Sequence, residues 1–289
     1  MSAYTSKIGK GYVFGSALIS MAIILLILAV LFITSYDAIT EVGWDMFTLK
    51  WNPPDGRFGI LSMLYGSLAV TFLSLLVSVP LGILTAIFTA EILPPKYRVY
   101  VKSGLELLAG IPSIIYGLIG VAFLSVWIGR LFDLQSGRTI FTAALILSIM
   151  ILPTIITLCD DAIRNVPQKY MEAARALGLY KYEVILSSAL PIAKTDITGA
   201  VLLALGRALG ETMAVMLVIG GIDKIPQPIY NFFSPGQTIT SKLGREITES
   251  AFGSLHFSAM IFMGAVLLAI VLSLTVIVQQ YFKTGRLYE

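Results

Sequence analysis

The stretch ITGAVLLALGRALGETMAVMLVIGGI, residues 197–222, decides how many times this chain can cross a membrane. It is long enough to span a bilayer, since a transmembrane helix needs about 20 mostly apolar residues. It nevertheless contains Arg207 and Glu211. An ionised side chain at the centre of a bilayer is costly, so both residues need a structural or functional reason to be there.

The composition of the whole chain is that of a membrane protein. Of its 289 residues, 57% are hydrophobic and 13% are charged, and the mean hydropathy is +0.86. These values lie beyond those of a soluble domain of this size. Five further runs lack Asp, Glu, Lys and Arg and are long enough to span: residues 11–36, 58–90, 107–129, 139–159 and 250–282. Together the six runs predict an all-α membrane protein with six transmembrane helices, arranged as a single transmembrane domain over residues 1–289.

The first run follows two lysines, as the apolar part of a signal peptide does, but it is too long and lacks a clear cleavage site. We therefore expect it to remain as the first transmembrane helix.

The distribution of Lys and Arg predicts the orientation in the membrane. With a cytoplasmic N-terminus, twelve basic residues lie inside: Lys7, Lys10, Lys96, Arg98, Lys102, Arg164, Lys169, Arg175, Lys181, Lys194, Lys283 and Arg286. Seven lie outside: Lys50, Arg57, Arg130, Arg138, Lys224, Lys242 and Arg245. Because cytoplasmic loops carry the excess of Lys and Arg, both termini are expected in the cytoplasm.

The chain carries no motif for nucleotide binding or for catalysis. It has no G-x-x-x-x-G-K-[ST] segment, so ATP hydrolysis, if it is required, has to take place in a partner. The single cysteine, Cys159, excludes an internal disulfide, and one histidine, His256, is too little for a metal site. The basic residues fall mostly in short loops, which indicates topology and not nucleic-acid binding. We expect neither an enzyme nor a cofactor.

Prolines inside the predicted spans should bend or break their helices. Pro80, Pro112 and Pro153 each remove one backbone hydrogen bond. The segment LLAGIPSIIYG, residues 107–117, combines Gly110, Pro112 and Ser113 and is the expected helix discontinuity. From residue type alone, a kink that serves only packing explains it equally well.

The longest inside segment, residues 160–194, is built as a compact structure. Pro167 is placed for a first helical turn, and YMEAARAL consists of strong helix formers. Gly178 is placed to end this helix, and residues 180–188 are expected to form a second short helix that closes at Leu190-Pro191. Asp160 and Asp161 are expected to end the preceding transmembrane helix in solvent. The small residues of this knob suit docking into a groove of another protein, and an amphipathic interfacial helix pair is the alternative.

This segment resembles the EAA loop of permeases from ATP-binding cassette (ABC) importers. In that family, the loop is the coupling element that sits in the ATPase subunit. One departure is Ser188, where the family usually has an apolar residue. The resemblance implies an ABC-importer permease fold, with an ATPase-coupling role for Glu172, Ala173, Ala174, Gly178, Leu190 and Pro191.

Two more stretches resemble the Pst-type phosphate permeases. ELLAGIPSIIYGL (residues 106–118) and GRALGETMAVMLVIGG (residues 206–221) are similar to two helices of these proteins, and GETMAV is closer to the PstC subunit than to PstA. The resemblance implies a multi-pass protein of the cell (inner) membrane that imports inorganic phosphate. Its expected partners are a second, PstA-like permease, two PstB-like ATPase subunits, an external PstS-like phosphate-binding protein and the lipid bilayer.

The chemistry of Arg207 and Glu211 agrees with an anion path. At positions i and i+4 of one helix, the two side chains would share a face. Arg binds oxyanions through two parallel hydrogen bonds and stays charged, while Glu can accept from a phosphate hydroxyl or hold Arg207 when no substrate is present. A purely structural pair of neutralising charges is the alternative.

Two other functions remain open at this point. A sulfate or molybdate importer would keep the coupling loop but would recognise a fully deprotonated oxyanion. A proton-coupled secondary anion transporter would need no ATPase-docking loop.

Overall fold

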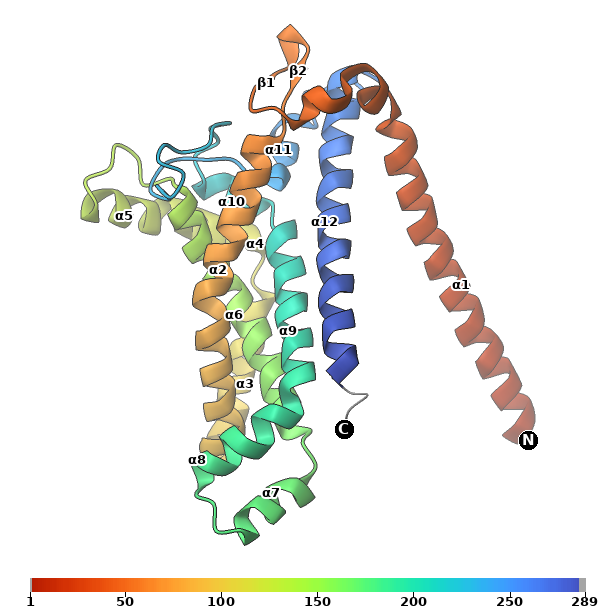
Figure 1. The fold of residues 1–289 in the computed structure, drawn as a ribbon, viewed down its shortest axis with the longest axis vertical. Coiled ribbons are helices and arrows are strands. Elements are labelled where there is room, and N and C mark those ends of the chain that lie inside the picture. The colour runs from red at the N-terminus through yellow and green to blue at the C-terminus, as the bar shows by residue number, and fades with distance from the viewer. Residues whose placement is uncertain (1, 286–289) are drawn as a thin grey trace.

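Six helices of the chain are long and apolar enough to cross a membrane, as the sequence predicts. They are found in a computed structural model that describes residues 2–285, so Arg286 lies outside the described residues. The six spans are Tyr12–Thr34, Leu61–Ile92, Ser113–Leu131, Ile140–Arg164, Lys181–Gly210 and Leu255–Val278. Figure 1 shows that most of them run along one common direction, whereas α1 (Ser2–Thr34) leans away and α5 (Ser125–Leu131), the last part of the third span, lies across the others.

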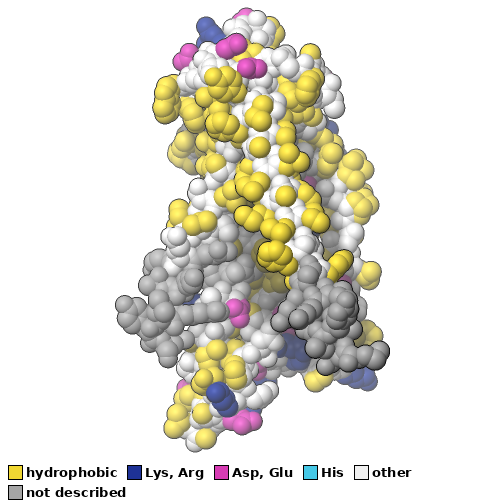
Figure 2. Space-filling view, turned by 90° about the vertical axis from the view of Figure 1, so that its right-hand side faces the viewer, with side chains coloured by type: hydrophobic (Ala, Val, Ile, Leu, Met, Phe, Trp, Pro, Cys, Tyr) yellow, Lys and Arg dark blue, Asp and Glu magenta, His cyan; other side chains and the backbone are white. Residues whose placement is uncertain are grey.

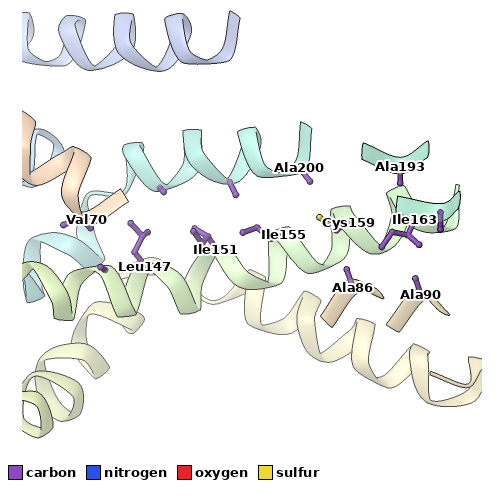
Figure 3. Packing of buried hydrophobic residues seen from close by; sticks show 14 of the residues in the cluster. Val70, Ala86, Ala90, Leu147, Ile151, Ile155, Cys159, Ile163, Ala193 and Ala200 are labelled. Atoms are coloured by element: carbon purple, nitrogen blue, oxygen red, sulfur yellow. The ribbon is translucent and has the colours of Figure 1, made fainter. Parts of the chain in front are cut away.

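Helix α6 (Ile140–Arg164) forms the centre of the bundle. Of its apolar window 67% is buried, against at most 33% for each of the other spans. It packs most extensively on α2 (Leu61–Ile87) and next on α9 (Leu190–Gly210). Figure 3 shows why the three helices approach closely: the large α6 side chains Leu147, Ile151 and Ile155 point toward small alanines of its neighbours, such as Ala200 of α9.

Polar contacts accompany this close approach of α2 and α6. The Ser148 hydroxyl donates to the carbonyl oxygen of Ser74 across the two helices, at 3.1 Å. Near the other end, the Thr89 hydroxyl donates to the Asp160 carboxylate at 2.8 Å. Asp160 is buried, and α6 continues to Arg164, so the expectation that Asp160 ends this helix in solvent is wrong. The hydrogen bond from Thr89 satisfies the carboxylate inside the bundle.

The predicted span at residues 197–222 exists, but its predicted boundaries are wrong. α8 (Lys181–Val184), a π-helical turn (Ile185–Ala189) and α9 form one helical segment that ends at Gly210, not at Ile222. The expected helix end at Leu190-Pro191 is therefore also wrong. Pro191 lies in the first turn of α9, where its missing N–H is tolerated. The loop between spans shortens to residues 165–180.

The prolines act differently from one another. Pro80 and Pro153 lie inside the uninterrupted helices α2 and α6. Pro112, in contrast, lies between α3 (Pro95–Gly110) and α4 (Ser113–Ile119), so the helix is interrupted where the sequence predicts it. The third span consequently begins at Ser113 and not at Leu107. It continues through a π-helical turn (Gly120–Leu124) into α5 (Ser125–Leu131).

Short elements cover the end of the bundle that lies opposite the two termini (Figure 1). After α1 come five short elements: the π-helical turn Ala38–Val42, the 3-10 turn Gly43–Phe47, β1 (Trp51–Asn52), the 3-10 turn Pro53–Asp55 and β2 (Arg57–Phe58). β1 and β2 are antiparallel, with Trp51 opposite Phe58. Near them lie α10 (Met213–Val218), α11 (Ile239–Glu246) and the start of α12 (Leu255–Gly285). Helix α7 (Gln168–Ala176) lies at the end where both termini lie.

The outer surface of the helices is apolar. Figure 2 shows apolar side chains covering the helices on one face, whereas Lys, Arg, Asp and Glu gather at the two ends. No residue of the apolar window of α1 is buried. Such a surface is stable against lipid or against another membrane subunit, since it would be unfavourable in water.

Replacement of Gly66 tests the contact that joins α2 to the segment before α11. A Cβ at Gly66 would overlap the backbone carbonyl oxygen of Gln237, which cannot rotate away as a side chain can. Gly66→Ala should therefore destabilise the fold by about 1–3 kcal/mol, measured as a lower thermal midpoint in detergent. The matched control is Gly104→Ala, because no atom lies near that position. An unchanged midpoint for Gly66→Ala would contradict this packing.

Candidate functional site

Arg207 lies in the last turn of α9, close to the point where the helix ends. Its Nη1 donates a hydrogen bond to the Thr154 hydroxyl of α6 at 3.0 Å, and the rest of the side chain is exposed in the single chain. A cation at this position is favourable because the last carbonyl oxygens of a helix carry partial negative charge. One neutral hydroxyl does not neutralise the guanidinium, so most of its donors remain available to an anion.

Glu211 lies in the break that follows. Its backbone is extended, and α10 begins only at Met213. The Glu211 Oε1 accepts a hydrogen bond from the Ala214 N–H at 3.2 Å, which caps the first turn of α10. The Glu211 carbonyl oxygen accepts from the Thr240 hydroxyl of α11 at 2.7 Å. Glu211 therefore holds two short elements, α10 and α11, at the end of α9.

The prediction that Arg207 and Glu211 share one helix face is wrong. The helix stops at Gly210, so the four-residue spacing no longer places the two side chains one turn apart. In the part of the chain that the structure describes, no ion pair joins them. The hypothesis that they serve to neutralise each other consequently has no contact to rest on.

The two helix interruptions belong to elements that pack together. A Cβ at Gly117 of α4 would lie 3.0 Å from the Ala214 Cα, so α4 and α10 are in close contact. Tyr116 of α4 donates its hydroxyl proton to the Leu108 carbonyl oxygen of α3 at 2.8 Å. This bond satisfies a carbonyl that the break between Gly110 and Ser113 leaves without its helical partner.

The turn after α7 needs the glycine that the sequence places there. Gly178 has a φ of +82°, which favours glycine. The Gly178 N–H donates to the Arg175 carbonyl oxygen at 2.9 Å, and the Leu179 N–H donates to the Ala174 carbonyl oxygen at 3.4 Å. This pair of bonds is the Schellman motif that closes a helix. Glu183 then accepts from the Tyr180 N–H at 2.7 Å and fixes the start of α8.

The loop has a buried side and a free side. Met171 and Ala174 are buried against the bundle. Glu172 and Ala173 are exposed, together with Leu177 and Tyr180, which are 83% and 71% exposed. Large apolar side chains exposed at a loop tip are typical of a protein contact. Leu190 and Pro191 lie further along, at the start of α9, and the loop residues are separated from Arg207 by the length of that helix.

Sequence reasoning missed α11. Residues 223–249 lie between two apolar runs, and their charges suggest only an outside loop. In the structure, part of this segment forms α11, which lies against α10. Arg245 of α11 donates from Nη2 to the Met216 carbonyl oxygen of α10 at 2.5 Å. Burial lowers the pKa of Arg245, although Asp223 opposes this shift. The signal that could have revealed α11 is Thr238 with Ser241 three residues later, which here form a capping box.

The fold and the loop define a membrane permease of the ABC-importer type. Over residues 78–285, the chain matches the family described as binding-protein-dependent transport system inner membrane component. The chain belongs to this family.

Several curated relatives share a large part of the chain. The phosphate transport system permease protein PstC of Mesorhizobium japonicum is 36% identical over 260 residues, which cover 83% of this chain and 78% of that protein. The PstC of Haemophilus influenzae is 32% identical over 278 residues and covers 88% and 87%. The probable ABC transporter permease protein YqgH of Bacillus subtilis is 36% identical over 223 residues, covering 76% and 71%.

Solved structures support the fold alone. A bacterial alginate ABC transporter in complex with an alginate pentasaccharide-bound periplasmic protein has a TM-score of 0.62 at 21% identity, covering 92% of this chain and 94% of that one. An inward-facing MetNI methionine ABC transporter has a TM-score of 0.57 at 14% identity, with coverage of 77% and 94%.

Proposed function

We propose that this chain is a permease subunit of an ATP-driven importer of inorganic phosphate and that it provides part of the phosphate path. The observation that carries the substrate assignment is Arg207, a charged guanidinium at the end of a membrane helix that has, among the residues the structure describes, a single neutral hydroxyl as its hydrogen-bond partner. Such a group needs an anionic ligand or a partner subunit. The names of the PstC relatives support phosphate as that ligand.

The expected partner subunits follow from the family and from the lack of a nucleotide-binding motif in the sequence. Without a phosphate-binding loop for nucleotides, the chain relies on separate ATPase subunits, and we expect two PstB-like ones. A PstA-like permease would cover the face on which Arg207 is exposed, and a PstS-like protein would deliver phosphate. The chain itself performs no chemistry on the substrate.

Coupling to the ATPases is assigned to the loop around Gly178. The exposed side chains Glu172, Leu177 and Tyr180 form the contact, and the Schellman turn holds them in place. ATP binding moves the ATPase subunits, and the loop passes this movement to α9. The Arg207 region then opens alternately to the two sides of the membrane.

The orientation completes the proposal. The loop and both termini face the cytoplasm, and the hairpin and α11 face outward, in agreement with the excess of Lys and Arg inside.

Labelling of Lys181→Cys, on a Cys159→Ser background, by an impermeant thiol reagent added to sealed cells would contradict this orientation. Phe252→Cys, at an 89% exposed position, is the matched outside probe and should react.

A sulfate or molybdate importer remains the second candidate. It would have the same loop and the same exposed arginine. It would not prefer phosphate, whose hydroxyl group can donate a hydrogen bond, over a fully deprotonated oxyanion. Uptake of labelled phosphate in the presence of excess sulfate or molybdate separates the two. Transport by this chain reconstituted alone, without ATPase, would instead favour a secondary transporter.

Substitution of Arg207 tests its contact with the anion. Arg207→Lys keeps the charge but loses the planar two-point fork, so phosphate uptake should fall at least about tenfold, as expected for loss of one charge-assisted hydrogen bond. Recovery of the intact complex should stay normal. The control is Thr154→Val, which removes only the protein partner of Arg207 and should reduce uptake much less. Normal uptake by both Arg207→Lys and Arg207→Ala would refute an anion contact, and loss of assembly in both would make Arg207 structural.

Substitution of Gly178 tests the coupling loop. A β-branched residue at this φ costs on the order of 1–3 kcal/mol, so Gly178→Val should weaken copurification of the ATPase roughly 5- to 100-fold. Gly178→Asn should retain most of it, because Asn tolerates this conformation. Equal ATPase recovery from the two variants would show that the turn does not position the contact.

A further inference from the structure

Lys242 of α11 is a buried ammonium group with two carboxylate partners. Its Nζ lies 2.5 Å from Asp223 Oδ2 and 2.5 Å from Glu246 Oε1, and its side chain is only 6% exposed. It also lies over the Trp51 ring, 5.3 Å from its centre. A buried charge is tolerated only when such partners are present, so breaking one of these pairs leaves a charge that the protein compensates poorly.

The partners of Lys242 tie several segments together at the outer end of the bundle. Glu246 Oε2 accepts from Trp51 Nε1 of β1 at 3.0 Å and lies 3.3 Å from His256 Nε2 in the first turns of α12. Asp223 lies in the loop that follows α10. We name Asp223, Lys242 and Glu246 the outer ion-pair cluster.

The opposite side of α11 is attached to the break at Glu211. Thr240 donates to the Glu211 carbonyl oxygen, and Arg245 donates to that of Met216. A Cβ at Gly244 would lie 2.9 Å from Thr212 Cγ2, so α11 directly covers the break. Any displacement of α11 therefore changes the surroundings of Glu211.

Asp223 is the member of the outer ion-pair cluster that is placed to separate from Lys242. It follows Gly220 and Gly221, which both have positive φ values and allow the loop to leave α10 sharply. Its buried Oδ1 has no hydrogen-bond partner within the described part of the chain, although Oδ2 contacts Lys242. Asp223 also lines an open groove of about 1100 Å³ between the hairpin and the loop of residues 222–235, so this side is reachable from outside.

We propose that the ion pair between Asp223 and Lys242 is an outer latch, with Lys242 as a positioning residue that keeps α11 closed over the break at Glu211. Transport requires this pair to separate so that α11 moves and the path opens outward. The inference rests on the proposed function, because it assigns the latch to the phosphate path.

The latch is tested by thiol accessibility in the complete complex. Thr212→Cys, placed under α11 on a Cys159→Ser background, is labelled with an impermeant reagent in proteoliposomes that contain the permeases and ATPases. Asp223→Asn should increase the labelling rate about tenfold, as expected when a hydrogen bond between charged groups is lost. Asp223→Glu, which keeps the carboxylate, should return the rate close to that of the parent. Glu249→Gln, at an exposed position after α11, is the matched control and should change nothing.

A second variant separates the latch from general misfolding. Lys242→Met removes the ammonium and so breaks the latch from its other side, and it should label as fast as Asp223→Asn. Parent-like labelling of Asp223→Asn, or fast labelling of Asp223→Glu, would overturn the latch. Phosphate uptake by the parent is measured in the same vesicles: if the parent transports no phosphate, the proposed function fails while the labelling rates still decide the latch.

Discussion

A helix that stops inside an apolar layer must have its free backbone groups satisfied by the protein, because lipid offers no hydrogen bonds. Two helices of this chain stop in this way, one after Gly110 and one after Gly210. Tyr116 binds a free carbonyl oxygen at the first break, and Thr240 binds one at the second. Both breaks therefore depend on polar side chains, and Arg207, in the last turn of α9 before the second break, contacts Thr154 of α6. The polar path proposed above depends on the same constraint as the fold.

One helical segment joins the loop around Gly178 to Arg207, the two regions on which the proposed function rests. Residues 181–210 connect them without a loop, through the π-helical turn Ile185–Ala189, at which α8 bends away from α9 (Figure 1). The first residues of this segment follow the turn at Gly178, and its last turn carries Arg207. A movement of the loop can thus be transmitted to Arg207 as a rigid-body movement of α9 against α6. The small residues of α9, such as Ala193 and Ala200, face α6 at this interface (Figure 3).

The sequence predicts the parts of this arrangement that depend on local chemistry. Five charge-free runs and the run that contains Arg207 and Glu211 predict six spans, Gly110 with Pro112 predicts a break, and Gly178 lies where a left-handed turn is needed. The end of α9 at Gly210 is different, because the same run also contains Gly199 and Gly206, and the helix continues through both of them. What stops the helix there is the contact of Glu211 with α11, which lies 29 residues away along the chain. The burial of Asp160 depends on Thr89 of another helix and on an ion pair with Arg164, which lies four residues further along α6 and is the local part of the signal.

The central claim is that residues 181–210 move as one body and shift Arg207 relative to α6. Distances between spin labels in the assembled, reconstituted complex test it directly. Labels at Tyr182 and Leu203, both exposed, report the length of the segment, and labels at Leu203 and Ile149 report its position against α6. On ATP binding, the first distance should stay constant while the second changes. A change in the first distance, or a fixed second distance during active transport, would contradict the account.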